Sequence, residues 1–121
     1  HARGTEGIPG RASRGESRVR FTLRIHPEAA EELDAAIAWY EQGGQHRGVA
    51  FEAAVDGVID RCLEWPRSGE VVPVPGTERV FRHARVQRSH YRLVYSVSGD
   101  EFAVLAFAHE SRMPLYWAGR D

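Results

Sequence analysis

The sequence of 121 residues contains one cysteine, no lysine and no asparagine. Because the single cysteine, Cys62, cannot form a disulfide within the chain, we expect a reducing, cytoplasmic environment. No apolar run approaches the roughly 20 residues of a membrane-spanning helix, and no apolar segment near the N-terminus resembles a secretion signal. Membrane proteins and secreted disulfide-rich proteins are therefore not expected classes, and the length suits one domain.

The net charge of −1 conceals a strong segregation of charge along the chain. Residues 1–25 carry six Arg and two Glu, whereas residues 26–64 carry nine acidic side chains and two Arg. The main basic feature is the window 79–92, which has no acidic residue and contains five arginines: Arg79, Arg82, Arg85, Arg88 and Arg92. Such a window could be a solvated sheet face, or it could bind an acidic protein segment or a nucleic-acid backbone.

Residues 1–17 contain almost no apolar side chains beyond Ile8. Such a segment cannot bury enough surface to offset the entropy lost on ordering, so it is predicted to be a flexible arm or a remnant of processing or expression. Residues 18–121 are predicted to form the domain.

Hydrophobic periodicity predicts an α+β fold for that domain. Residues 18–25 alternate as a half-buried strand does, and Pro27 begins a helix of about 15 residues that ends at Gly43–Gly44. A second helix is predicted over residues 49–64, ending before Pro66. Three further strands follow, over residues 79–86, 91–97 and 102–109. This order predicts a helical hairpin packed on a four-stranded antiparallel sheet.

Several segments together resemble a known family. They are HPEAAEEL (26–33), AIAWY (36–40), a helix ending in WP (65–66), YRLVY (91–95), and VLAFAH (104–109) followed by Arg112 and Pro114. In this order and spacing, over roughly residues 19–117, they resemble the RelE/ParE toxin superfamily. The resemblance implies a growth-inhibiting toxin of a type II toxin-antitoxin system, of the plasmid stabilisation type, that a cognate antitoxin protein holds inactive. It implies no cofactor.

The family has two activities, which are inhibition of DNA gyrase and ribosome-dependent cleavage of messenger RNA. For a nuclease, the resemblance places Arg92 at the scissile phosphate and His109 among the terminal catalytic groups, while Glu78 is the one nearby acid that could act as a base. The helical hairpin with Trp39–Tyr40 and the absence of lysine favour the ParE branch, hence gyrase. A non-toxic binding module of the same fold is the third alternative.

The remaining candidate residues are contact residues. The target-binding set comprises Arg79, Arg82, Arg85, Arg88 and Arg112. Tyr116 and Trp117, in a tail with few apolar neighbours, are predicted to contact a partner protein. His83 and His90 have no Cys or carboxylate at metal-ligand spacing, so no metal site is expected.

Overall fold

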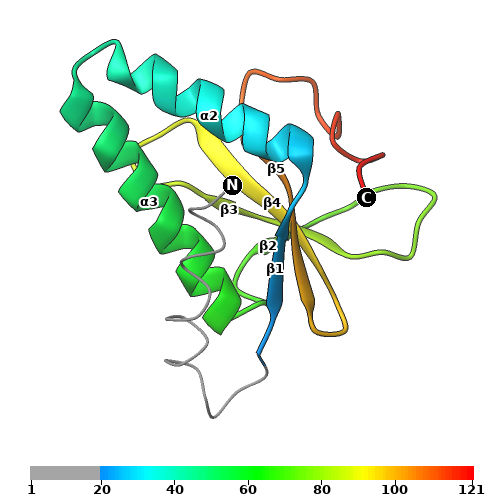
Figure 1. The fold of residues 1–121 in the computed structure, drawn as a ribbon. Helices are drawn as coiled ribbons and strands as arrows, with labels where there is room; N and C mark the ends of the chain where they lie inside the picture. The colour runs from blue at the N-terminus through cyan, green and yellow to red at the C-terminus, as the bar shows by residue number, and fades with distance from the viewer. Residues whose placement is uncertain (1–19) are drawn as a thin grey trace.

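The structure, a computed structural model, describes residues 20–121 (Figure 1). Strand β1 (Thr22–Ile25) leads into a helical hairpin of α2 (Pro27–Glu41) and α3 (Gln45–Glu64). Four strands follow: β2 (Glu70–Val72), β3 (Phe81–Arg85), β4 (Tyr91–Ser98) and β5 (Glu101–His109). The predicted α+β class and helical hairpin are confirmed, whereas the predicted arm, residues 1–17, lies outside the described residues.

The sheet differs from the prediction in two respects. Within residues 20–121 it has five strands, in the order β1-β5-β4-β3-β2, because β2 adds a short edge strand beside β3. It is also not antiparallel throughout, because β1 runs parallel to β5, with Thr22 opposite Glu101 and Ile25 opposite Val104. Parallel neighbours need a long connection, and here the whole chain between β1 and β5 provides it.

The helix ends follow from local chemistry. The His26 side chain caps α2 by accepting a hydrogen bond from the Glu28 backbone N–H (3.1 Å), and Pro27 occupies the first turn, as predicted. Gly44 adopts φ +123°, a conformation that side chains disfavour, and this lets α3 begin at Gln45 rather than at the predicted Val49. In the described residues, no helix is long and apolar enough to cross a membrane.

Two apolar clusters cover the two faces of the sheet. On the helix side, Leu33 of α2 and Val55 of α3 pack against Leu93, Tyr95 and other residues of the central strands. On the far side, Phe81 and Leu105 pack under Trp117 of the C-terminal segment. Figure 1 shows this layering, with the helices on one side of the sheet and the C-terminal segment on the other.

Strand β5 contains a bulge opposite Val94 and Tyr95 of β4. Val94 of β4 pairs with Ala106 and Tyr95 with Val104, so Leu105 has no opposite residue. The extra residue shifts the alternation of β5 by one position, and Leu105 and Ala106 therefore both belong to the far-side cluster.

Candidate target-binding site

Three arginines gather at the end of the sheet where β3 turns into β4. Arg85, the last residue of β3, lies directly opposite Arg92 of β4. Cross-strand partners point to the same face of a sheet, and this face is the far side, away from the helices. Arg88, in the turn between the strands, is exposed. We call Arg85, Arg88 and Arg92 the arginine rim.

Beyond the backbone pairing of the strands, the side chains of the arginine rim form no hydrogen bond or ion pair with any residue in the range 20–121. Glu70 interacts electrostatically with Arg92 of the rim, but its hydrogen-bond partner is His83, with 2.8 Å between Oε1 of Glu70 and Nε2 of His83. That hydrogen bond, and then the charge of His83, lower the pKa of Glu70, while Arg92 makes a smaller electrostatic contribution. Within residues 20–121, the guanidinium groups of the rim therefore have no ion-pair partner.

The other predicted target-binding arginines contact groups within the molecule, although Arg112 is exposed. Arg79 donates from Nε to the hydroxyl of Ser96 (3.3 Å), and Arg82 donates from Nη1 to the carbonyl of Gly69 (2.8 Å). The guanidinium of Arg112 lies 3.9 Å from the ring centroid of Tyr116. These three side chains are engaged within the molecule. Of the predicted target-binding set, Arg85 and Arg88 belong to the rim, and Arg92, predicted as a catalytic residue, joins them.

The structure does not bring the predicted catalytic residues together. Arg92 pairs with Ala108 on the far side of the sheet, whereas His109 pairs with Tyr91 on the helix side. The ring centroids of His109 and Tyr91 lie 5.0 Å apart, edge to face. Glu78 is three residues before β3, and Arg92 is opposite the last residue of that strand. The five residues of β3 alone span about 13 Å, so Glu78 is at the other end of the sheet.

His109 has local partners of its own. Its Nδ1 accepts a hydrogen bond from the backbone N–H of Ser111 (3.0 Å) and lies 2.7 Å from the Ser111 hydroxyl. Its ring centroid is 6.0 Å from that of His90, which in turn contacts Glu110 at 3.0 Å. The end of β5 is thus a small, partly exposed cluster of rings.

The two predicted partner contacts lie within the molecule. Trp117 is only 4% exposed, and its ring centroid is 5.2 Å from that of Phe81. The hydroxyl of Tyr116 donates to Oε2 of Glu32 (2.8 Å), and burial followed by this bond raises the pKa of Tyr116. Sequence reasoning missed Glu32, because it lies on α2, far from the tail in sequence.

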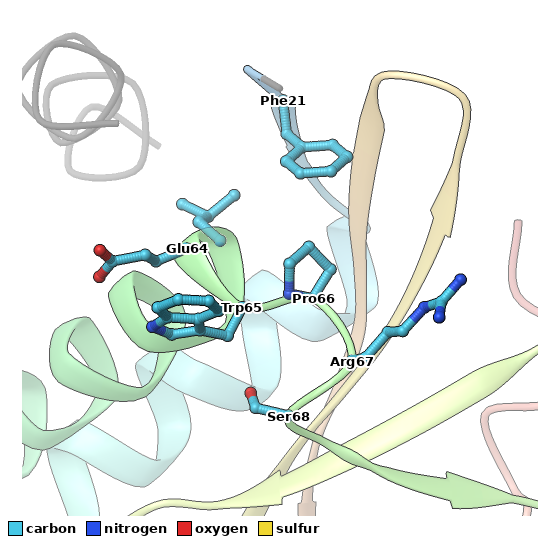
Figure 2. Close-up of a pocket in the computed structure, with 7 residues that line it drawn as sticks. Phe21, Glu64, Trp65, Pro66, Arg67 and Ser68 are labelled. Atoms are coloured by element: carbon cyan, nitrogen blue, oxygen red, sulfur yellow. The ribbon is translucent and has the colours of Figure 1, made fainter. Parts of the chain in front are cut away.

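An apolar pocket of about 740 Å³ was also not predicted (Figure 2). It lies between the start of β1 and the end of α3, and Phe21, Leu63, Trp65 and Pro66 supply its apolar walls. The sequence signal was the WP pair, which was interpreted only as a helix end. Glu64, Arg67 and Ser68 are its polar lining residues, and no predicted catalytic residue reaches it.

Comparison with known proteins identifies a family and solved structures that are similar to this chain. The family model for the ParE toxin of the type II toxin-antitoxin system parDE matches residues 23–114. A chain solved as "Chromosomal ParDE TA system from P. aeruginosa" aligns with a TM-score of 0.62 and 19% identity. The alignment covers 76% of this chain and 98% of that one, and at this identity it shows a shared fold. No curated protein sequence in the comparison matches. Because the family model spans most of its length, the chain belongs to the ParE toxins of type II toxin-antitoxin systems, as the resemblance to the RelE/ParE superfamily implied.

Proposed function

We propose that this ParE-type toxin inhibits DNA gyrase and that a cognate antitoxin protein neutralises it. Membership of the family supplies the toxin class, and the description of that family supplies the antitoxin as partner. The arginine rim is the surface proposed to meet the target, because its three guanidinium groups have no hydrogen-bond or ion-pair partner within residues 20–121. Tyr116 and Trp117 act in this proposal by holding the C-terminal segment in place rather than by touching the antitoxin directly.

The observation that favours gyrase over RNA cleavage is the separation of the candidate catalytic groups. Metal-free RNA cleavage requires a base, a cation and an acid around a single phosphate. Arg92 and His109 lie on opposite faces of the sheet, and Glu78 is at the far end of β3. Arg92 can reach a phosphate at the rim, but the side chain of His109 points to the other face and Glu78 is at the other end of the strand. Inhibition of gyrase needs no such chemistry from the toxin.

Induced expression of the full chain in a bacterial host tests this proposal. The DNA-damage response and bulk translation are followed together, for the wild type and for His109→Ala. We expect damage signalling while translation is still intact, and the same toxicity from His109→Ala. Early arrest of translation that His109→Ala abolishes would favour ribosome-dependent RNA cleavage instead. Normal growth with folded protein would favour the non-toxic binding module.

A purified system separates the target from downstream effects. Gyrase supercoiling of a relaxed plasmid is measured with toxin alone and with toxin preincubated with its antitoxin. We expect inhibition by the toxin, with cleaved plasmid accumulating, and recovery when the antitoxin is present. Unchanged supercoiling at a large molar excess of folded toxin would overturn the gyrase proposal.

A further inference from the structure

We propose that the arginine rim binds the phosphate backbone of DNA without regard to sequence. On this view the toxin contacts DNA that its target holds, as well as the target protein. The inference rests on the proposed function for the identity of that complex, but the binding itself can be measured without gyrase. Arg79, Arg82 and Arg112 have contacts within the molecule, whereas the three side chains of the rim have no hydrogen bond or ion pair within residues 20–121.

The pairing of Arg85 with Arg92 is the first argument. Like charges directly opposite one another across two strands destabilise a sheet, and residues in such pairs have Cα atoms only about 4.5–5.5 Å apart. No carboxylate in the described residues forms an ion pair with either side chain. A phosphate group placed between them can accept hydrogen bonds from both guanidinium forks and relieve the repulsion.

The backbone of Arg88 is the second argument. Its φ of +60° places it in the left-handed region, which glycine and asparagine adopt more easily than other residues. The turn therefore carries an arginine where the backbone favours glycine. Strained residues of this kind concentrate at functional sites, and here the strained residue is an exposed arginine in the turn that joins the strands of the Arg85–Arg92 pair.

The distribution of charge gives the ligand one direction of approach. Residues 26–64, which form the helical hairpin, carry nine acidic side chains and two arginines. They cover one face of the sheet, and the Arg85–Arg92 pair points to the other. A polyanion is repelled on the helix side and attracted at the rim, which orients it before contact.

The immediate surroundings favour a nucleic-acid backbone over an acidic peptide. The neighbour of Arg92 on β5 is the small side chain of Ala108, and His83 lies on the same face two residues before Arg85. Peptide segments usually add apolar anchors that fill pockets, and none of the residues that line the apolar pocket belongs to the rim. A surface that offers charge with little apolar area suits phosphates, which position a nucleic acid without reading its sequence.

Fluorescence anisotropy with a labelled DNA duplex tests the inference, using the full chain. Three phosphate contacts predict a slope of about −2.7 in log K against log salt, or about a 40-fold loss of affinity between about 50 and 200 mM salt. The double variant Arg85→Ala/Arg92→Ala is expected to reduce that loss to about 3- to 4-fold, because one contact remains. A second duplex of unrelated sequence should bind equally well.

The matched control is Arg61→Ala. Arg61 is exposed in the last turn of α3, on the acidic layer, so its removal changes the net charge by the same amount per residue. This variant should retain the wild-type salt slope. Circular dichroism verifies that each variant is folded, and Arg88→Gln, in the exposed turn, replaces the double variant if that variant does not fold. Equal slopes for rim and control variants would overturn the proposal.

Two further outcomes are decisive. Absence of salt-dependent DNA binding by the folded wild type would overturn the proposal. The proposal would also fail if a polyglutamate peptide displaced DNA at a lower concentration of negative charges than DNA itself requires and bound the same variants more weakly. The latter result would identify the rim as a site for an acidic protein segment. DNA binding that survives while gyrase is not inhibited would leave this inference standing and overturn the proposed function alone.

Discussion

Arg120 and Glu32 form a two-pronged ion pair across 88 residues of sequence, with Nη1 to Oε1 at 3.1 Å and Nη2 to Oε2 at 3.0 Å. The pair lies at the edge of β5 beyond the last residue of β1. There the backbone N–H of Phe107 donates to Oε1 of Glu32 (3.0 Å), and Nη1 of Arg120 donates to the carbonyl of Leu105 (2.9 Å). Two side chains thus satisfy backbone groups that a longer β1 would have paired.

Arg120→Ala should destabilise the protein by about 3 kcal/mol, because it leaves the nearly buried carboxylate of Glu32 without its main counterion. Both side chains are only 13–14% exposed, so water screens the pair weakly. Equilibrium urea unfolding measures the change. Glu28→Gln is the control, because Glu28 is 54% exposed and reaches Arg120 only at 3.5 Å. It should cost less than about 1 kcal/mol, and equal effects of the two variants would contradict this account.

Trp117→Ala should destabilise the protein by about 3–5 kcal/mol, since the ring is buried against Phe81 and its loss leaves a cavity on the far side of the sheet. Trp39→Ala removes the same side chain from a position that is 62% exposed, and it should cost under about 1 kcal/mol. Urea unfolding of both variants, compared at equal m-values, measures the difference. A small effect of Trp117→Ala would show that the C-terminal segment is not held on the sheet.

The helical hairpin and the central strands could be predicted because their signals are local. Val55 and Cys62 lie on the apolar stripe of α3, and Leu93 and Tyr95 alternate in β4, so periodicity alone identified each buried face. The direction of β1 could not be predicted in this way, because its partner is nearly 80 residues away and parallel pairing leaves no turn signal. The short edge strand β2 has too few residues for any period to show.

The sequence predicted the basic region as a whole but not which of its arginines form the candidate site. The density of arginine in the window 79–92 marked the basic region, but it could not separate Arg82 from Arg85. That difference arises because Arg82 finds the backbone carbonyl of Gly69, which periodicity does not reveal. The burial of Trp117 in the C-terminal segment could not be predicted for a similar reason. Few apolar residues surround Trp117 in sequence, while its neighbours in space come from β3, β4 and β5.

Tyr95→Phe should destabilise the protein by about 1–3 kcal/mol, because it removes one hydroxyl that satisfies two backbone groups. The Tyr95 hydroxyl accepts from the N–H of Gly69 (3.0 Å) and donates to the carbonyl of Pro66 (2.7 Å). It thereby fastens the link after α3 to the sheet. Urea unfolding near neutral pH measures the loss, and an unchanged midpoint would contradict this role.

The same hydroxyl predicts a dependence on alkaline pH. Burial, followed by the influence of Cys62, raises the pKa of Tyr95 from 10.0 to about 12. A group whose pKa is higher in the folded state stabilises fully below the unfolded pKa and loses that contribution as pH rises through the folded value. The stability difference between wild type and Tyr95→Phe should therefore shrink from pH 10 to 12. A difference that is constant over that range would show that Tyr95 ionises as freely in the folded protein as in the unfolded one.

Arg88→Gly should make the protein more stable and less able to bind DNA. The φ of +60° costs an ordinary residue about 1–2 kcal/mol, and glycine avoids this cost while losing more chain entropy on folding, so a net gain of about 0.5–1 kcal/mol is expected. Gln87→Gly is the control, because Gln87 is exposed in the same turn and its φ is not positive. It should be neutral or destabilising. Thermal unfolding and duplex binding are measured on both variants. If Arg88→Gly gains stability and keeps the full salt slope, the strained backbone at this turn serves something other than the proposed phosphate contact.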